Sequence, residues 1–242
     1  MNLAIDFGNT LTKLALFETY ELKHKFVLEK LTIDDLNAIL TNHFIENIIY
    51  SSVVQLEMDL EDYLKRKNAL VLTATTPLPF QNQYRTPATL GKDRLAAVAA
   101  ATHLFPHQNT LVIDAGTCIT YDWLLKGKNY IGGNIAPGLQ MRLSAMHEFT
   151  DALPLVDNHW NEQYVGDSTT TAMQNGALLG TLLEMEGIIE WSSSKWNEIN
   201  VILTGGNTDF FANHLKKRIF ASPELVLIGL NKILDYNARL EE

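Results

Sequence analysis

The feature that most constrains this chain is a strand–turn–strand unit that occurs twice. Residues 3–10 read LAIDFGNT and residues 111–117 read LVIDAGT, so each is an apolar run that ends in Asp-x-Gly and a hydroxyl or amide residue. A second apolar run follows each copy, at residues 14–17 and 119–123. Both copies predict β-hairpins with a glycine-containing turn. Asp114 follows Asp6 by almost half of the 242 residues, which indicates an ancient duplication.

Strands and helices are expected to alternate around these hairpins. Residues 32–35 resemble a capping box and predict a helix through about residue 40. Further helices are predicted up to residue 67, over 91–104, after 138, over 168–191 and after 206, and further strands over 47–54, over 69–73, near 130 and over 201–204. This order predicts an α/β protein with two halves, residues 1–109 and 110–242, packed around a cleft.

Composition narrows the class of protein. Hydrophobic residues make up 46% and charged residues 19% of the chain, as in ordinary globular proteins. The net charge of −9 argues against a nucleic-acid partner, because such binding needs a concentrated positive surface. Cys118 is the only cysteine, so no intramolecular disulfide can form. Neither a signal-peptide pattern nor a bilayer-length apolar stretch is found, so we expect a soluble cytoplasmic protein without a membrane partner.

The first hairpin turn has the composition of a phosphate-binding loop. Its backbone N–H groups and the side chains of Asn9 and Thr10 can donate hydrogen bonds to phosphate oxygens. Asp6 ends a buried strand and is well placed to hold Mg²⁺ directly or through water, and Lys13 could add a positive charge. The alternative is a plain turn that uses Asp and Asn for turn chemistry. The second copy, and a third glycine turn at residues 204–207 (TGGN), make that alternative less favoured.

Residues 84–94 (YRTPATLGKDR) bring Lys-Asp-Arg to the start of a predicted helix. Asp93 could accept the proton of a substrate hydroxyl, which is the role of the base in phosphoryl transfer. Arg94 offers a fork of donors that suits a carboxylate or a phosphate. By spacing alone, a second interpretation is favoured, in which Asp93 complements the helix dipole and Arg94 lies on the solvated face.

The ordered motifs resemble the type III pantothenate kinase family. The match comprises the DFGNT turn at 6–10, Tyr84, GKDR at 91–94, IDAGT at 113–117, GGNIAPG at 132–138, TDALP at 150–154, GDST at 166–169 and TGG at 204–206. Each motif is permissive alone, but the ordered set is highly specific. The resemblance implies a duplicated ribonuclease H-like (actin-like) fold, in which two similar halves with mixed sheets flanked by helices surround a central cleft.

The resemblance also implies roles for individual positions. Asp93 would be the catalytic base, Asp114 would help to hold a monovalent cation (K⁺ or NH₄⁺), and Asp6 would hold Mg²⁺ through water. ATP would be bound by Asp6, Phe7, Gly8, Asn9, Thr10, Leu11, Thr12, Lys13 and Thr117. Pantothenate would be bound by Tyr84, Gly91, Lys92, Asp93, Arg94 and Thr169, the last across the interface of a homodimer. Lys92 occupies a variable position of its motif, and Asp167 precedes Ser168 and Thr169 where a less acidic residue is expected.

The implied reaction is ATP-dependent phosphorylation of pantothenate to 4′-phosphopantothenate, the first step of coenzyme A biosynthesis. Three alternatives stay open. A sugar or acetate kinase would share the phosphate turns but differ over residues 84–94. An ATP-binding regulatory protein would bind nucleotide without turnover, which the presence of Asp93 disfavours. A ribonuclease H-like nuclease would pair Asp6 and Asp114 around two metals, which the acidic composition disfavours.

Overall fold

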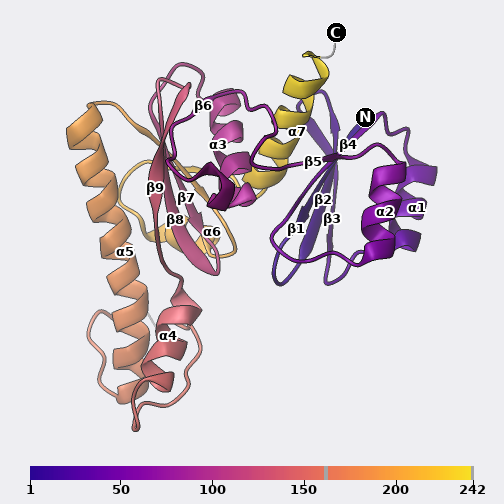
Figure 1. Cartoon of the computed structure of the whole chain (residues 1–242). Helices are drawn as coiled ribbons and strands as arrows, with labels where there is room; N and C mark the ends of the chain where they lie inside the picture. Colours follow the sequence, from indigo (N-terminus) through magenta and orange to yellow (C-terminus); the bar gives the residue numbers. More distant parts are fainter. Residues whose placement is uncertain (161–162, 241–242) are drawn as a thin grey trace. The chain divides into compact units, whose positions relative to one another are not determined.

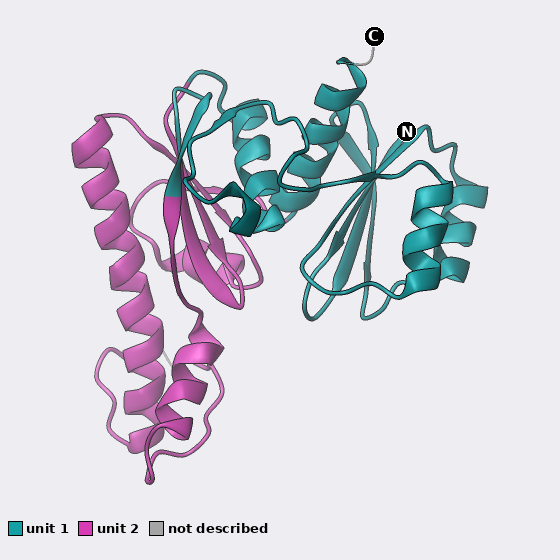
Figure 2. Ribbon diagram, in the orientation of Figure 1, with its two compact units in different colours: residues 1–107, 124–132, 224–242 teal, residues 108–123, 133–223 magenta. Residues whose placement is uncertain are grey.

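The computed structural model describes residues 1–160 and 163–240, which form two compact units (Figures 1 and 2). The first unit contains residues 1–107 and 124–132 together with the C-terminal segment that begins at Glu224, and the second contains residues 108–123 and 133–223. The boundary of the duplicated halves after residue 109 stays a prediction. Within the described ranges, no helix is long and apolar enough to cross a membrane.

The first unit contains a five-stranded mixed sheet in the order β3-β2-β1-β4-β5. Its antiparallel part is the predicted hairpin with one further strand, and β4 and β5 add parallel to β1. Helices α1 and α2 cover an apolar core on this sheet (Figure 1). The elements are β1 (Asn2–Phe7), β2 (Thr12–Glu18), β3 (Glu21–Leu28), α1 (Ile33–Asn42), β4 (Asn47–Ser52), α2 (Met58–Arg66) and β5 (Leu70–Val71).

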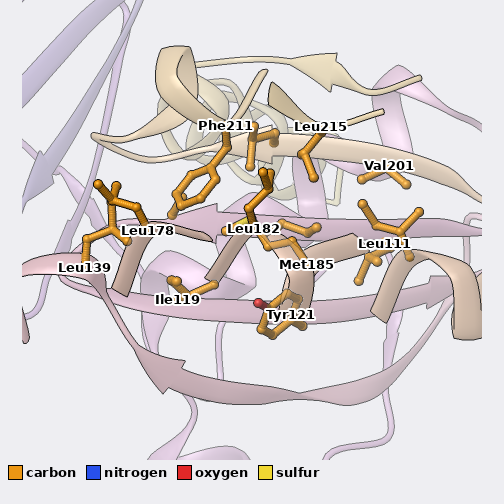
Figure 3. Close-up of a cluster of buried hydrophobic side chains, with 14 of the residues drawn as sticks. Leu111, Ile119, Tyr121, Leu139, Leu178, Leu182, Met185, Val201, Phe211 and Leu215 are labelled. Atoms are coloured by element: carbon orange, nitrogen blue, oxygen red, sulfur yellow. The ribbon is translucent and has the colours of Figure 1, made fainter. Parts of the chain in front are cut away.

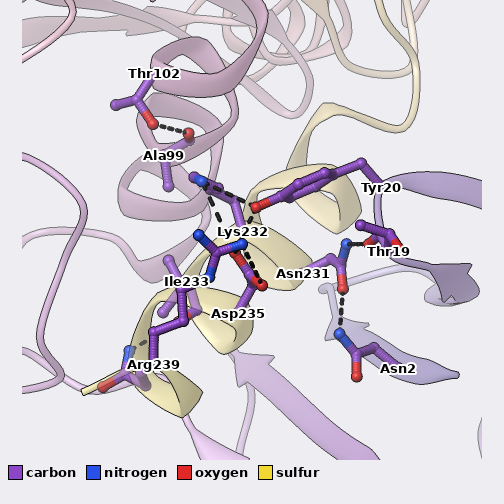
Figure 4. A network of polar contacts seen from close by, with 11 residues as sticks. Asn2, Thr19, Tyr20, Ala99, Thr102, Asn231, Lys232, Ile233, Asp235 and Arg239 are labelled. Atoms are coloured by element: carbon purple, nitrogen blue, oxygen red, sulfur yellow. Dashed lines mark hydrogen bonds and ion pairs between the residues drawn. The ribbon is translucent and has the colours of Figure 1, made fainter. Parts of the chain in front are cut away.

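Two further helices of the first unit, α3 (Lys92–Leu104) and α7 (Leu225–Ala238), pack closely on each other. Small side chains allow this approach: a Cβ on Gly229 would lie only 1.7 Å from the carbonyl oxygen of Ala96. Polar contacts also tie α7 to the first hairpin (Figure 4). Asn231 donates to the carbonyl of Thr19 at 2.7 Å and accepts from Asn2 at 2.9 Å. The start of α3, where the predicted base lies, is therefore anchored by the end of the chain.

The second sheet repeats the order of the first. It runs β9-β8-β7-β10-β11, with β6 added beyond β9, and β10 lies parallel to β7 just as β4 lies parallel to β1. Asp6 and Asp114 both occupy the fifth position of the first strand in their hairpin, β1 and β7 respectively. This correspondence confirms the predicted duplicated α/β fold. The strands are β6 (Gln81–Asn82), β7 (Thr110–Ala115), β8 (Cys118–Leu125), β9 (Asn129–Pro137), β10 (Asn200–Thr204) and β11 (Phe220–Ala221).

The second unit has its own apolar core, built from β7, β8, β10 and the helices α5 (Thr169–Trp196) and α6 (Thr208–His214) (Figure 3). Tyr121, Met185 and Phe211 are among its buried side chains. Helix α4 (Leu139–Glu148) packs beside α5 through a smaller cluster that includes Leu143 and Met173 (Figure 1). A short 3₁₀ helix, Pro87–Thr89, precedes α3 in the first unit.

Most predicted elements occur within two residues of their expected bounds. The capping box at Thr32 forms with Asp35 and begins α1. Two expectations were wrong in extent: the strand predicted over 69–73 is only two residues long, and the helix predicted to end near 191 continues to Trp196. Its serines persist in the helix because Ser192 is fully buried and accepts a hydrogen bond of 2.9 Å from the Trp123 indole. Sequence reading missed β3, β6, β11 and α7.

Candidate active site

The predicted phosphate loop is the turn between β1 and β2 in the first unit. A hydrogen bond of 3.1 Å from the Gly8 N–H to the Leu11 carbonyl closes this turn. Asn9, Thr10 and Leu11 are exposed at its tip, whereas Phe7 and Thr12 are buried. The Phe7 side chain packs in the core, so only its backbone is available to a ligand. The tip therefore presents one amide and one hydroxyl side chain, which suits an anionic oxygen.

Asp6 stands at the base of this turn, with Lys13 as its antiparallel register partner. On its other side, Ser51 of β4 is the parallel register partner, and its hydroxyl donates a hydrogen bond of 2.9 Å to Oδ1 of Asp6. Burial raises the pKa of Asp6, and the negative charge of Asp93 raises it further. The Ser51 hydrogen bond and the Lys13 charge act in the opposite direction on that pKa. Asp6 is thus a largely desolvated carboxylate that would gain from a nearby cation.

Asp93 lies in the first turn of α3, after Gly91 at the N-cap and Lys92 as the first helical residue. Its Oδ1 accepts a hydrogen bond of 2.9 Å from the Arg94 N–H, so one carboxylate oxygen helps to cap the helix. Within the part of the chain that the structure describes, no donor is bonded to Oδ2. Asp93 therefore retains one oxygen that can accept a substrate proton, close to Asp6 in the same unit.

Arg94 does not lie on a solvated face, contrary to the helix-dipole interpretation. Its side chain is buried, with 5% of its surface exposed. One guanidinium nitrogen donates to the Tyr130 hydroxyl at 3.2 Å, and the guanidinium carbon lies 5.7 Å from the centre of the Tyr84 ring. Tyr84 stacks on Tyr130 with ring centres 6.3 Å apart and planes at 14°. The fold thus joins both ends of the segment predicted to bind substrate.

Asp114, Thr117 and Thr169 belong to the second unit. Asp114 pairs in register with Thr204, at the strand end that precedes the third glycine turn. Asn207 ties this turn to β7, because its backbone and side-chain N–H groups each donate to the Ala115 carbonyl at 3.1 Å. Thr117 is exposed in the turn that leads into β8. The second and third glycine turns therefore lie together at one end of the second sheet.

Thr169 is the exposed first residue of α5, directly after the N-cap Ser168. Ser168 and Thr171 form a reciprocal capping box at this helix start. Asp167, the acidic residue that departs from the expected motif, accepts a hydrogen bond of 3.2 Å from the Thr171 hydroxyl. Its role in this structure is therefore to support the cap, which leaves the Thr169 side chain accessible.

A divalent metal at Asp6 would have to take most of its ligands from elsewhere. Across residues 1–160 and 163–240, no group of three or more His, Cys, Asp or Glu side chains could hold a metal ion. Mg²⁺ commonly binds through one or two carboxylates, with waters and substrate phosphates as its other ligands. Oδ1 of Asp6 accepts the hydrogen bond from the Ser51 hydroxyl, and a single carboxylate in this setting fits Mg²⁺ delivered with a nucleotide.

Sequence reading missed two residues that the fold brings into this region, Ser51 and Tyr130. Both are fully buried, and each contacts a predicted site residue across a distance of more than 35 residues in the sequence. The sequence carried a weak signal for Ser51. Parallel strands end at the same edge of a sheet, so the end of a neighbouring parallel strand lies close to Asp6. Tyr130 gave no local signal beyond its place in a predicted strand.

The repeated sheet order and the paired Asp-x-Gly turns define a protein with the duplicated actin-like fold. The solved structures that share this fold include a Baf family protein from Campylobacter jejuni, with a TM-score of 0.63 and 22% identity over 98% of this chain and 99% of that chain. They also include a ROK hexokinase from Thermus thermophilus, with a TM-score of 0.51 and 13% identity over 98% of this chain and 99% of that chain. At these identities the likeness shows the fold alone.

Sequence similarity identifies the family within that class. The chain belongs to the type III pantothenate kinase family, whose sequence profile matches residues 2–191. A type III pantothenate kinase from Christiangramia forsetii is 43% identical over 240 residues, which cover 98% of this chain and 99% of that protein. The resemblance predicted from the ordered motifs is confirmed.

Proposed function

We propose that this protein transfers the γ-phosphoryl group of ATP to the primary hydroxyl of pantothenate, giving 4′-phosphopantothenate for coenzyme A biosynthesis. Membership of the type III pantothenate kinase family supports the substrate. The observation that carries the chemistry is the proximity of Asp93 and Asp6 within one unit, one with a free carboxylate oxygen and the other desolvated. These two carboxylates suit separate roles, acceptance of a proton and charge balance at the phosphates.

The nucleotide would bind with its phosphates against residues 6–13. Backbone N–H groups of the turn, Asn9, Thr10 and Lys13 would donate to phosphate oxygens, and Asp6 would hold Mg²⁺ through water. When bound, the metal would help to neutralise the charge on the transferring phosphoryl group. The antiparallel partnership of Asp6 and Lys13 supports this arrangement, because it puts both charges on one face of the hairpin.

Pantothenate would bind against Tyr84, Gly91, Lys92 and Arg94, with Asp93 as the base. The buried guanidinium of Arg94 suits the carboxylate of pantothenate, since a planar fork of donors pairs with both carboxylate oxygens. Asp93 would then accept the hydroxyl proton on the oxygen that does not cap the helix. Positioning and electrostatic stabilisation supply most of the catalysis in phosphoryl transfer.

Two residues of the second unit have proposed roles in binding ligands. Thr117 would contact ATP, and Asp114 would help to hold a monovalent cation, K⁺ or NH₄⁺. Support comes from the equivalence of Asp114 and Asp6 in the repeated sheet, and from the glycine turns that lie beside Asp114.

A homodimer would bring Thr169 to the pantothenate site of the partner subunit. The exposed face of α5 supports such an assembly, because small residues follow one another along it: Ala172, Gly176, Gly180 and Gly187. A Cβ on any of those three glycines would meet open space. Small side chains let helices approach closely, so this face suits the same helix of a second copy. We place the enzyme in the cytoplasm.

A coupled assay of ADP release tests this proposal. With Mg²⁺ and ATP, addition of pantothenate should stimulate ADP release strongly in K⁺ and weakly in Na⁺ alone. A panel of sugars and acetate should give no stimulation. If pantothenate fails to stimulate release in either salt, the proposed reaction is wrong. Sedimentation of the purified chain tests the dimer separately, and a monomer at micromolar concentration would contradict it.

A further inference from the structure

Tyr130 occupies an unusual place for a residue with a polar group. It lies on β9 with none of its surface exposed, and its backbone pairs with β6, where the carbonyl accepts a hydrogen bond of 2.9 Å from the Gln83 N–H. A buried phenol normally finds a hydrogen-bond partner for its hydroxyl. The guanidinium of Arg94 donates to this hydroxyl at 3.2 Å.

The ring of Tyr130 contacts the other end of the same segment. Tyr84 stacks on it at 6.3 Å, and Phe80 meets it edge-on with ring centres 6.0 Å apart. Tyr130 thus contacts Tyr84 with its ring and Arg94 with its hydroxyl. These contacts couple the loop before α3 to the first turn of α3.

Gly132 supports the same arrangement from two positions further along β9. Residues two apart on a strand face the same side, so Gly132 and Tyr130 both face Tyr84. A Cβ on Gly132 would lie 3.3 Å from the Tyr84 ring, and its φ of +112° is a conformation that glycine adopts readily. The strand therefore leaves room for the Tyr84 ring at one position and stacks on it at the other.

An arginine binds both oxygens of a carboxylate more tightly when its long side chain is already held in one rotamer. The entropy of ordering the side chain otherwise weakens the binding. Arg94 is on a helix that is anchored by α7, and its guanidinium is fixed by the Tyr130 hydroxyl and the Tyr84 ring. We propose that Tyr130 is a positioning residue for acceptor binding, which orients Arg94 through its hydroxyl and Tyr84 through its ring. This inference rests on the proposed roles of Tyr84 and Arg94 in binding pantothenate.

Tyr130→Phe tests the hydroxyl while it retains the ring. Loss of a hydrogen bond to a charged group should raise the KM for pantothenate about tenfold. The KM for ATP and kcat should change less than about twofold, because the interaction is lost equally in the ground state and the transition state. Calorimetric titration with pantothenate in the presence of a non-hydrolysable ATP analogue should show the same loss of affinity.

Tyr121→Phe is the matched control. Tyr121 is also buried, and its hydroxyl also bonds to a charged partner, Glu184 at 2.7 Å, but it belongs to the second unit. The control variant should keep the wild-type KM for pantothenate. Wild-type pantothenate-dependent ADP release must be present first, so its absence would count against the proposed function and not against this inference.

A double-mutant cycle with Arg94→Lys shows whether Tyr130 acts through Arg94. The two substitutions should be strongly non-additive in their effect on the pantothenate KM. All KM values are measured well below the melting midpoint of each variant. An unchanged KM in Tyr130→Phe, additive effects in the cycle, or a fall in kcat alone would each overturn the proposal, as would loss of the folded state in Tyr130→Phe.

Discussion

The Ser51 hydroxyl donates a hydrogen bond of 2.9 Å to the Asp6 carboxylate, across the parallel pair of strands β1 and β4. Ser51 is fully buried and lies 45 positions from Asp6 in the sequence. The hydrogen bond lowers the pKa of Asp6 against the effect of burial. Ser51 therefore favours the ionised form of the proposed metal-binding carboxylate and fixes its direction.

Removal of this hydroxyl should weaken the response to Mg²⁺. In Ser51→Ala, the Mg²⁺ concentration for half-maximal activity should rise about tenfold, since a hydrogen bond to a charged group is lost. Saturating Mg²⁺ should restore most of kcat. The control is Ser52→Ala, because the Ser52 hydroxyl bonds to the Val54 backbone and not to Asp6. Initial rates at fixed ATP measure both variants, and equal Mg²⁺ requirements would contradict the assignment.

Asp93→Asn should abolish most turnover without loss of nucleotide binding. The amide oxygen can still accept the hydrogen bond from the Arg94 N–H, so the start of α3 should be preserved. Loss of the base should lower kcat by roughly 10² to 10⁴. Asp59→Asn is a control for a first-turn aspartate, on α2, and should leave kcat unchanged. Near wild-type turnover in Asp93→Asn would show that another group accepts the proton.

Asp6→Asn should stabilise the protein while it disables catalysis. The pKa of Asp6 is raised above 3.8 in the folded state, chiefly by burial and then by the charge of Asp93. Folding therefore favours the protonated carboxyl. As pH rises from the ordinary pKa through the raised one, ionisation of Asp6 lowers the free energy of unfolding. The amide cannot ionise, so without Mg²⁺ or nucleotide the variant should have a higher melting midpoint than the wild type at about pH 7. This advantage should shrink as pH falls toward 3.8.

Asp35 provides a control, because its pKa is shifted in the opposite direction to that of Asp6. Hydrogen bonds from the side chain and then the backbone of Thr32 lower the pKa of this exposed carboxylate. The ionised Asp35 carboxylate stabilises the folded protein at a pH above its ordinary pKa. This stabilisation is lost as pH falls through the lowered pKa of the folded state. Asp35→Asn should therefore melt lower than the wild type near neutral pH, with a difference that also shrinks in acid. Melting curves from about pH 3 to about pH 8 test both variants, and a lower midpoint for Asp6→Asn at neutral pH would refute the prediction.

Gly229→Ala should separate α3 from α7. The new Cβ would lie 1.7 Å from the Ala96 carbonyl oxygen, so one helix has to move. Overpacking of this kind costs about 1–3 kcal/mol, partly offset by the higher helix propensity of alanine. Because α3 carries Asp93 and Arg94, kcat/KM for pantothenate should fall as well. Urea unfolding and steady-state kinetics measure the two effects, and an unchanged unfolding midpoint would show that the helices absorb the methyl group.

Local sequence determined the elements and the repeated turns. The apolar runs on either side of Asp6 and Asp114 are short-range signals, and so is the capping box at Thr32. Each signal involves residues only a few positions apart, because capping hydrogen bonds and hydrophobic periodicity belong to a single strand or helix. The order of the motifs was also sufficient to predict the family, because that comparison needs only positions along the chain.

Tertiary structure alone decided what surrounds the site residues. The sequence left Arg94 open between a solvated helix face and a substrate role. In the fold Arg94 is buried and bonded to Tyr130, which is 36 positions away. The partnership of Ser51 with Asp6 likewise exists only because β4 adds parallel to β1. Which distant strands pair depends on how the whole faces of a sheet pack. No short stretch of sequence contains that information. The identities of the reactive side chains are therefore local information, whereas their orientation and ionisation follow from the fold.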